Sequence, residues 1–293
     1  MKTAVIQMNS SGDKRRNIEK ALSFLHAAAG RKARFILLPE VFNYRGGIKT
    51  KQDLRMISEE IPGVLRHAQD DSKDGERSRT KSLRPFLDAA RKSKAFVLAG
   101  SIYEKGEGSQ KVYNTSALIS PEGKVIAKYR KIHLFDAILK KKAIRESDFF
   151  LAGKKIVIAR IEQFNVGMSI CYDLRFPELY RACARLGAHV LCVPSAFTKI
   201  TGQVHWEVLL KARAIENLCY VLAPNQTGTD ARGIEAFGHS LIISPWGEIL
   251  ARASATAEEI IFADLSLPEV QKARRVFPSV QRSRFGVVRE EKR

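Results

Sequence analysis

A cysteine lies where an apolar run of the sequence ends and a helical segment begins. Residues 164–170 are typical of a strand, Cys171 follows them directly, and Pro177 stands in the first turn of the next helix. A strand–turn–helix segment presents its central side chain at a sheet edge. The N–H groups and dipole of the nearby helix N-terminus favour a thiolate there. The pattern makes Cys171 a candidate nucleophile, with a buried core cysteine as the alternative.

Core positions suit the remaining cysteines better, because each lies within an apolar helix or strand pattern: Cys183, Cys192 and Cys219. Two other polar residues follow apolar strands, as Cys171 does. Glu40 comes after residues 35–39, and Lys131 comes after residues 125–130. Read singly, Glu40 also fits a helix cap and Lys131 a solvated strand end, and spacing alone does not show that the three residues meet.

A carboxylate, an ammonium and a thiol at one sheet edge would form a hydrolytic set. The carboxylate of Glu40 would take the thiol proton of Cys171 and later activate water. The thiolate would then attack a carbonyl or nitrile carbon. The ammonium of Lys131 and the main-chain N–H of Tyr172 would stabilise the resulting oxyanion.

The elements that must position these residues alternate between strands and helices. We expect strands at residues 2–8, 33–38, 95–103, 112–120, 124–133, 156–162, 165–170, 189–194, 218–224, 238–244, 248–252 and 259–264. We expect helices at residues 17–30, 81–93, 177–187 and 205–217. Hairpins mixed with β–α crossovers predict an α/β fold with a mixed sheet and helices on its outer faces.

Composition narrows the class of protein. The chain has 293 residues, of which 45% are hydrophobic, enough for one large domain or two small ones. The cysteines and histidines show no disulfide or metal-ligand spacing, so no metal is expected. No run approaches the roughly 20 apolar residues of a membrane span, and the N-terminus reads as a strand. We therefore expect a soluble, reduced, cytoplasmic protein without a membrane partner.

The formal net charge of +19 raises the possibility of a nucleic-acid partner. The basic residues, however, are spread along the whole chain, and no nucleic-acid-binding motif accompanies them. Solvated faces that also attract small anionic substrates explain this charge better, so we do not expect a nucleic-acid partner.

Several long motifs in this chain resemble those of the nitrilase superfamily of carbon–nitrogen hydrolases, in its Nit-type amidase branch. The motifs similar to those around the family's glutamate, lysine and cysteine are Leu37 to Phe42, Tyr129 to Asp136 and Gly167 to Glu178. Further similar segments, in the same order, are residues 194–198, 201–202, 205–210, 213–217, 237–240 and 244–248. The resemblance covers about residues 1–267.

The resemblance implies a single-domain αββα sandwich that forms a homodimer or a higher even oligomer through paired helices. It also implies a catalytic triad of Glu40, Lys131 and Cys171, and no cofactor. A second glutamate near the family's site corresponds to Glu146, in a motif similar to residues 145–147 and 152–153. Its expected role is to orient the lysine and the incoming amide, with a surface salt bridge as the alternative.

In this branch the substrates are ω-amides of short dicarboxylic acids, or deaminated glutathione. A carboxylate at the far end of such a substrate needs a fixed cation, and Arg175 is the candidate, because a guanidinium binds a carboxylate with two parallel hydrogen bonds. The alternative for Arg175 is an ion pair with Glu178 or Asp173, although Asp173 more plausibly braces the turn. The family's other substrate contacts correspond to Phe197, Thr201 and Tyr172.

Other readings stay open at this point. The same triad would serve an N-carbamoyl amino acid hydrolase or a nitrilase, and a catalytically silent basic binding protein is the alternative from another class. The chain departs from the family in a hydrophilic insertion at 67–81 and in the lysine-rich segment 137–144, which replaces a loop that borders the pocket in the family. We expect the hydrolase domain to span 1–267. The basic residues 268–293 would form an extension that packs at the dimer interface or is partly mobile.

Overall fold

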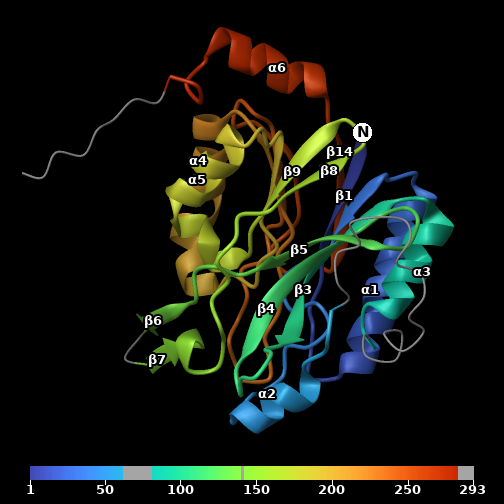
Figure 1. Ribbon diagram of the computed structural model, residues 1–293, viewed down its shortest axis with the longest axis vertical. Coiled ribbons are helices and arrows are strands. Elements are labelled where there is room, and N and C mark those ends of the chain that lie inside the picture. Colours follow the sequence, from blue (N-terminus) through green and yellow to red (C-terminus); the bar gives the residue numbers. More distant parts are fainter. Residues whose placement is uncertain (62–80, 140–141, 283–293) are drawn as a thin grey trace, which may run out of the picture.

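The computed structural model describes residues 1–61, 81–139 and 142–282 (Figure 1). The expected insertion at 67–81 therefore falls almost wholly outside the described residues. In the part of the chain that is described, no helix is long and apolar enough to cross a bilayer.

The first sheet has the strand order β14-β1-β2-β3-β4-β5. Its strands are β1 (Lys2–Gln7), β2 (Phe35–Leu37), β3 (Phe96–Lys105), β4 (Val112–Ile119), β5 (Val125–Arg130) and β14 (Glu259–Asp264). β1, β2 and β3 are mutually parallel, and the remaining pairs are antiparallel. The register of β3 and β4 shifts between Ala99 and Ile102, a bulge beside the segment that carries Glu40.

The second sheet has the strand order β13-β12-β11-β10-β9-β8. Its strands are β8 (Ile158–Ile161), β9 (Phe164–Met168), β10 (Val190–Cys192), β11 (Tyr220–Ala223), β12 (Leu241–Ile243) and β13 (Ile249–Arg252). β9, β10 and β11 are parallel, with Val190 opposite both Val166 and Tyr220. The carboxyl ends of these parallel strands meet at one edge of the sheet.

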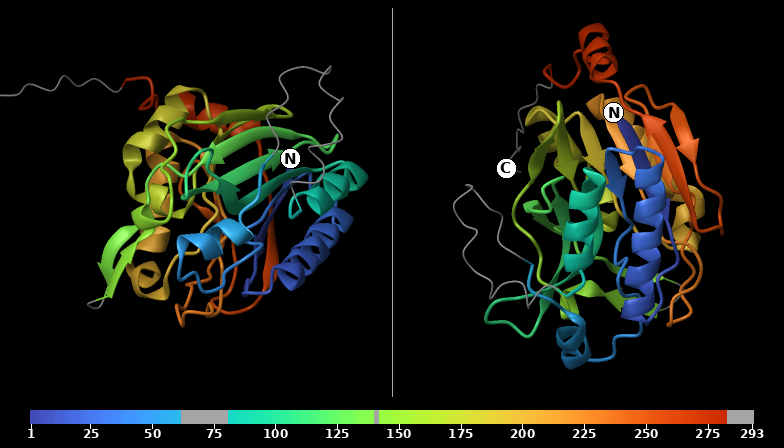
Figure 2. Two further views of the ribbon diagram at one scale, coloured as in Figure 1. Left: turned by 60° about the horizontal axis from the view of Figure 1, so that its bottom comes forward. Right: turned by 90° about the vertical axis from the view of Figure 1, so that its right-hand side faces the viewer.

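Four of the six α-helices of the described residues cover the outer faces of the two sheets. The six are α1 (Lys14–Gly30), α2 (Lys51–Ile57), α3 (Arg84–Ser93), α4 (Pro177–Arg185), α5 (Lys199–Asn217) and α6 (Leu267–Val276). The helices α2 and α6 lie at opposite ends of the molecule (Figure 1). α1 and α3 lie on one side of the stacked sheets and α4 and α5 on the other, so the layers follow the order α, β, β, α (Figures 1 and 2). This arrangement confirms the expected αββα sandwich.

The buried side chains form three layers that match this order. One cluster joins α1 and α3 to the first sheet, for example Leu25 and Phe86 to Ile36. A central cluster fills the space between the sheets, where Leu37 and Leu98 of the first sheet share a core with Met168 and Cys192 of the second. Because side chains alternate along a strand, each sheet contributes to two of these layers.

Local sequence accounts for the start of most helices. The Asp13 side chain caps α1 by accepting from the N–H of Arg16, and Thr50 and Asp53 form a capping box at α2. Proline stands at the start of α3, α4 and α6. The sequence patterns did not predict α2, α6 or the hairpin of β6 (Asp136–Leu139) and β7 (Lys142–Arg145).

Candidate active site

Three strand ends meet at one cavity. Glu40 follows β2, Lys131 follows β5, and Cys171 follows β9 of the other sheet. The cavity has a volume of about 290 Å³, and these three side chains line it together with Glu146. The expected substrate contacts Tyr172, Arg175, Phe197 and Thr201 line the same cavity. The structure thus brings together all the site residues that the sequence predicted.

The backbone beside Glu40 is tightly constrained. Val41 has a φ of 49°, a left-handed conformation that is strained for a β-branched residue. Its N–H donates to the hydroxyl of Ser101 at 3.0 Å. A side chain at Gly100 would place a Cβ 1.9 Å from the carbonyl oxygen of Pro39. The bulge of β3 therefore packs against the turn and holds Glu40 at the cavity.

The carboxylate of Glu40 is buried and accepts hydrogen bonds from several directions. Its Oε1 accepts from Nδ2 of Asn114 at 2.8 Å and from Nζ of Lys131 at 3.2 Å. Its Oε2 accepts from the N–H of Ala196 at 2.8 Å, and the carboxylate lines the same cavity as the thiol of Cys171. This set fixes the carboxylate beside the sulfur, where it can accept a proton.

Lys131 is buried between two carboxylates. Its Nζ lies 2.9 Å from Oε2 of Glu146 and 3.2 Å from Oε1 of Glu40. Burial by itself lowers the pKa of Lys131, but the attraction of Glu146, of Glu40 and of Cys171 outweighs it and raises the pKa well above its ordinary value. The side chain is therefore a fixed cation at neutral pH.

Glu146 connects this lysine to the β6–β7 hairpin. Its Oε2 also accepts from the N–H of Phe135 at 2.8 Å, and its own N–H donates to the carbonyl of Phe135. A surface salt bridge was the alternative for Glu146, and it does not fit, because its ionic partner Lys131 is only 1% exposed. Glu146 thus bridges the buried cation and the base of the hairpin.

Cys171 begins a 3₁₀ helix (Cys171–Arg175) that leads into α4. Its φ is 47°, and its N–H donates to the carbonyl of Pro194 at 3.0 Å. The core-cysteine alternative fits Cys183, Cys192 and Cys219, which are buried, while Cys171 is half-buried and lines the cavity.

The helix N-terminus was expected to favour a thiolate at Cys171, and the immediate surroundings of the sulfur act in the opposite direction. Burial raises the pKa of the thiol well above its usual value, and the negative charge of Glu40 raises it further, while Lys131 opposes these effects less strongly. Cys171 therefore rests as a neutral thiol, and it needs Glu40 as a base.

Arg175 provides a cation near the sulfur. Its guanidinium lies 5.2 Å from the ring centre of Phe197 and 5.7 Å from that of Tyr172, and Nη1 is 3.2 Å from Nδ1 of His205. Among the described residues no carboxylate lies within ion-pair distance of it, so the alternative pairing with Glu178 or Asp173 is not formed. The charge of Arg175 is available to an anionic group in the cavity.

Other residues lining the cavity escaped the sequence patterns. Tyr103 lies within β3, Asn114 lies within β4, and Arg45 and Arg232 belong to loops. The buried Arg45 donates to the carbonyls of Thr227 at 3.1 Å and Ile234 at 3.2 Å, while Arg232 pairs with Asp230 at 2.7 Å. No motif or spacing marks them, because only tertiary packing brings them to the site.

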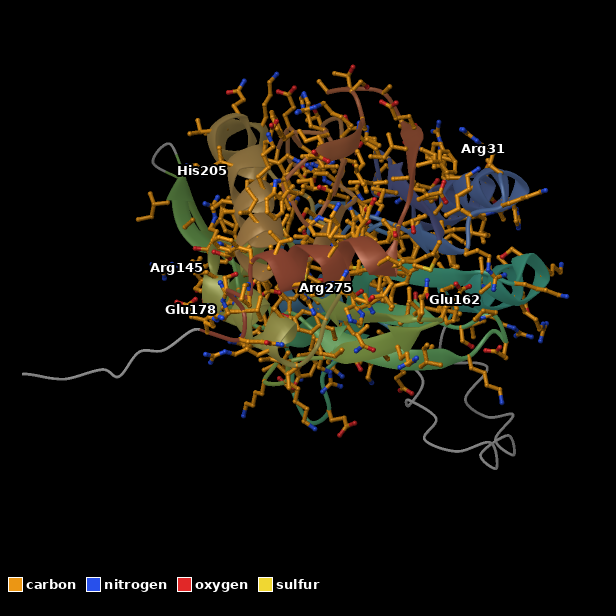
Figure 3. All side chains as sticks on the ribbon, turned by 90° about the horizontal axis from the view of Figure 1, so that it is seen from above. Arg31, Arg145, Glu162, Glu178, His205 and Arg275 are labelled. Atoms are coloured by element: carbon orange, nitrogen blue, oxygen red, sulfur yellow. The ribbon has the colours of Figure 1, made fainter. Side chains whose placement is uncertain are left out.

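The hairpin borders one side of the cavity. It projects from the body of the molecule below α5 (Figure 1), and Ile144 and Arg145 of β7 line the cavity. Figure 3 shows Arg145 and His205 on the same side of the molecule, opposite Arg31 and Glu162. The departure from the family at 137–144 thus falls on this hairpin.

Metal ligands are not gathered at this site. Across the described residues, no cluster of three or more His, Cys, Asp and Glu side chains could hold a metal ion. The reactive groups that meet in the cavity are a thiol, two carboxylates and an ammonium.

The sequence of this chain matches a known protein family and is similar to several named proteins. Residues 2–275 match the family described as "Carbon-nitrogen hydrolase". The chain is 35% identical to the omega-amidase NIT2 of Homo sapiens, over 96% of this chain and 94% of that protein. It is also 35% identical to the deaminated glutathione amidase of Dictyostelium discoideum, over 93% of this chain and 90% of that protein.

Solved structures of similar proteins share the fold of this chain. The Nit3 protein of Saccharomyces cerevisiae, a member of branch 10 of the nitrilase superfamily, superposes with a TM-score of 0.82 at 32% identity and covers 97% of both chains. The NitFhit protein of C. elegans superposes with a TM-score of 0.83 at 32% identity, over 97% of this chain and 65% of that one.

Proposed function

The chain belongs to the carbon-nitrogen hydrolase family, and from that premise we propose that it is a thiol amidase acting on a small carboxylate-bearing amide. It cleaves the C–N bond through a thioester on Cys171 and releases ammonia. The observation that carries this proposal is that Glu40, paired with the ammonium of Lys131 at 3.2 Å, lines one cavity with the Cys171 thiol, whose pKa it raises.

The first half of the cycle forms the thioester. Glu40 takes the proton of the Cys171 thiol as the sulfur attacks the amide carbon. The carbonyl oxygen becomes an oxyanion, which the ammonium of Lys131 and the N–H of Tyr172 stabilise. The tetrahedral intermediate then expels the nitrogen, which receives its proton from Glu40, and ammonia leaves.

The second half releases the acid. Glu40, now a carboxylate again, removes a proton from a water molecule that attacks the thioester carbon. The C–S bond breaks, the thiolate recovers its proton, and the carboxylic acid leaves. Glu146 has no proton to transfer in this scheme; its role is to fix the Lys131 ammonium and to orient the incoming amide.

Arg175 selects the substrate by charge. The far carboxylate of a short dicarboxylic monoamide would pair with its guanidinium, and Phe197 and Thr201 would flank the same end of the cavity. The omega-amidase and deaminated glutathione amidase names of the relatives support this class of substrate.

A substrate panel tests the proposal. Ammonia release should be observed with succinic monoamide, and not with nitriles or N-carbamoyl amino acids. Cys171→Ala should lower the rate by at least about 1,000-fold while the circular-dichroism spectrum and melting temperature stay close to wild type. Wild-type turnover by Cys171→Ala would refute the mechanism, and a preference for nitriles or carbamoyl compounds would refute the substrate class.

The proposed enzyme works as a homodimer through α5. One face of this helix exposes Ile200, Val204 and Val208, of which Val204 is 67% exposed, and Trp246 and Leu250 are exposed as well. The turn at Gly247 packs against Ile215 of the same helix. Exposed apolar side chains grouped on one helix and its neighbouring strand are typical of a contact between copies.

Association is measured directly by light scattering. Val204→Glu with Val208→Glu should convert the dimer to a monomer, whereas Met56→Glu on exposed α2 should not. A wild-type monomer would contradict this part of the proposal. The four free cysteines accord with a reducing, cytoplasmic location.

A further inference from the structure

Asp173 is a fully buried carboxylate two residues after the nucleophile. Its Oδ2 accepts from the hydroxyl of Tyr129 at 2.6 Å and from the N–H of Ile170 at 2.9 Å. Its Oδ1 accepts from the N–H of His133 at 3.0 Å and contacts Nδ1 of the same residue at 2.7 Å. These four contacts occupy the lone pairs of both oxygens.

The surroundings of Asp173 differ from those of the other buried carboxylates among the described residues. Each of the others pairs with a lysine or arginine: Glu40 with Lys131, Glu59 with Lys14, Glu104 with Lys128 and Arg130, and Asp230 with Arg232. The side chain nearest to a counter-ion for Asp173 is the imidazole of His133. Placing a carboxylate here costs free energy that an apolar residue would not cost, so the fold alone gives little reason for it.

The partners of Asp173 flank the catalytic residues. Tyr129 and His133 stand two residues before and two residues after Lys131, and Ile170 directly precedes Cys171. Lys131 ends a strand of the first sheet, whereas Cys171 follows a strand of the second. Asp173 therefore holds both backbones at one point.

The imidazole of His133 is itself fixed. It stacks on the ring of Phe176, with ring centres 3.6 Å apart and planes within 6°. Because Asp173 is an acceptor, Nδ1 must carry the proton in this contact. The ring cannot turn away without losing both the stacking contact and the hydrogen bond.

We propose that Asp173, with His133 and Tyr129, is a positioning unit that sets the distance between the Lys131 ammonium and the Cys171 sulfur. None of the three transfers a proton to substrate. Their effect is on the geometry of attack, so it falls on kcat rather than on KM. A strained nucleophile with a φ of 47° needs such a brace to persist. The inference rests on the proposed amidase chemistry.

Isosteric variants test the unit. Asp173→Asn should lower kcat for succinic monoamide by about 100-fold and leave KM within about threefold, since small displacements of reacting groups have effects of this size. The rate at which iodoacetamide alkylates Cys171 should fall in parallel. Because alkylation needs no amide hydrolysis, it still reports on positioning if the substrate assignment fails.

Two substitutions of His133 distinguish the effect of its hydrogen bond to Asp173 from the effect of its side-chain volume. His133→Asn places an amide N–H near the position of Nδ1, and it should keep kcat within about tenfold of wild type. His133→Gln offers its amide farther out and should resemble Asp173→Asn. If Asp173→Asn does not fold, the comparison of these two His133 variants still tests the positioning unit.

A matched control removes a buried carboxylate elsewhere. Glu59→Gln loses its ion pair with Lys14 and one of the two acceptor oxygens that bind Ser82, so it should lower the melting temperature while kcat stays within about threefold. The proposal is overturned if folded Asp173→Asn keeps wild-type kcat, if Glu59→Gln loses as much kcat, or if the two His133 variants behave alike.

Discussion

The N–H of Ala196 donates to Oε2 of Glu40 across 2.8 Å, although 156 residues separate the two. Glu40 follows β2 of the first sheet, and Ala196 comes after β10 of the second. This bond therefore crosses from one sheet to the other inside the active site. Together with the contacts from Lys131 and Asn114, it fixes the carboxylate from both sides.

Gly100→Ala should disturb this arrangement from a distance. The added Cβ would lie 1.9 Å from the carbonyl of Pro39 and 2.3 Å from that of Leu38, so the strand end before Glu40 must shift. We expect a loss of about 2 kcal/mol or more in the free energy of unfolding, with a marked fall in kcat. Urea denaturation and ammonia release measure the two effects.

Gly47→Ala is the control for this change, because a Cβ there meets no atom within 4 Å. Its stability and its kcat should match wild type. Wild-type stability in Gly100→Ala would show that the bulge yields easily.

Glu146→Gln should shift the alkaline limb of the kcat profile to lower pH. The buried Lys131 keeps its proton because Glu146 and Glu40 raise its pKa against the effect of burial. Removing the charge of Glu146 lowers that pKa, so the ammonium is lost at a less alkaline pH and the oxyanion loses its cation. A pH–rate profile with an unchanged alkaline limb would count against this account.

Arg175→Gln should raise KM for a carboxylate-bearing amide by about 10-fold or more, because a charged pair at a partly buried site is lost. Butanamide, which lacks the carboxylate, is the matched substrate, and its kinetics should change little. Steady-state assays with both amides measure the effect. Equal losses with both would mean that Arg175 supports the fold of the turn rather than the substrate.

Cys219→Ala should change the alkaline stability of the protein. Burial raises the pKa of this thiol from an ordinary 9.0 to about 11. The folded state therefore keeps a proton that the unfolded chain loses above pH 9, and the stabilisation that this thiol contributes is present below pH 9 and disappears as the pH rises to about 11.

The stability difference between wild type and Cys219→Ala should accordingly shrink by about 1.4 kcal/mol per pH unit across that window. Urea denaturation under reducing conditions at several pH values measures it. A difference that stays constant from pH 8 to 11 would contradict the assignment.

Much of the site could be predicted from the sequence, because its polar residues directly follow apolar strands. Glu40, Lys131 and Cys171 are such residues, and the carboxyl ends of neighbouring strands come together in a layered sheet. The upward shift in the pKa of the Cys171 thiol did not follow, because it depends on burial and on the charge of Glu40, which no local pattern encodes.

The first turns of α5 show a second limit. The sequence predicted a helix from residue 205, yet α5 begins at Lys199 and includes Gly202. A glycine disfavours a helix locally, but here a Cβ would lie 2.3 Å from the ring of Phe237. Close packing against Phe237 therefore requires glycine, and tertiary contact overrides propensity.

The hairpin β6–β7 was missed for a related reason. Its charged residues carry no alternating apolar pattern. Bonds at its base, such as that from the N–H of Ser147 to Asp136 at 3.0 Å, fix its direction instead.

The central core between the sheets has a consequence for how such an enzyme adapts. The nucleophile Cys171 and the base Glu40 follow strands of different sheets. Apolar side chains such as Leu98 and Met168 fill the space between these sheets and act as a spacer between the two residues. One methylene more or less in that spacer would alter the gap between sulfur and carboxylate by a fraction of an ångström. Substitution of apolar residues that do not contact the substrate can thus change kcat.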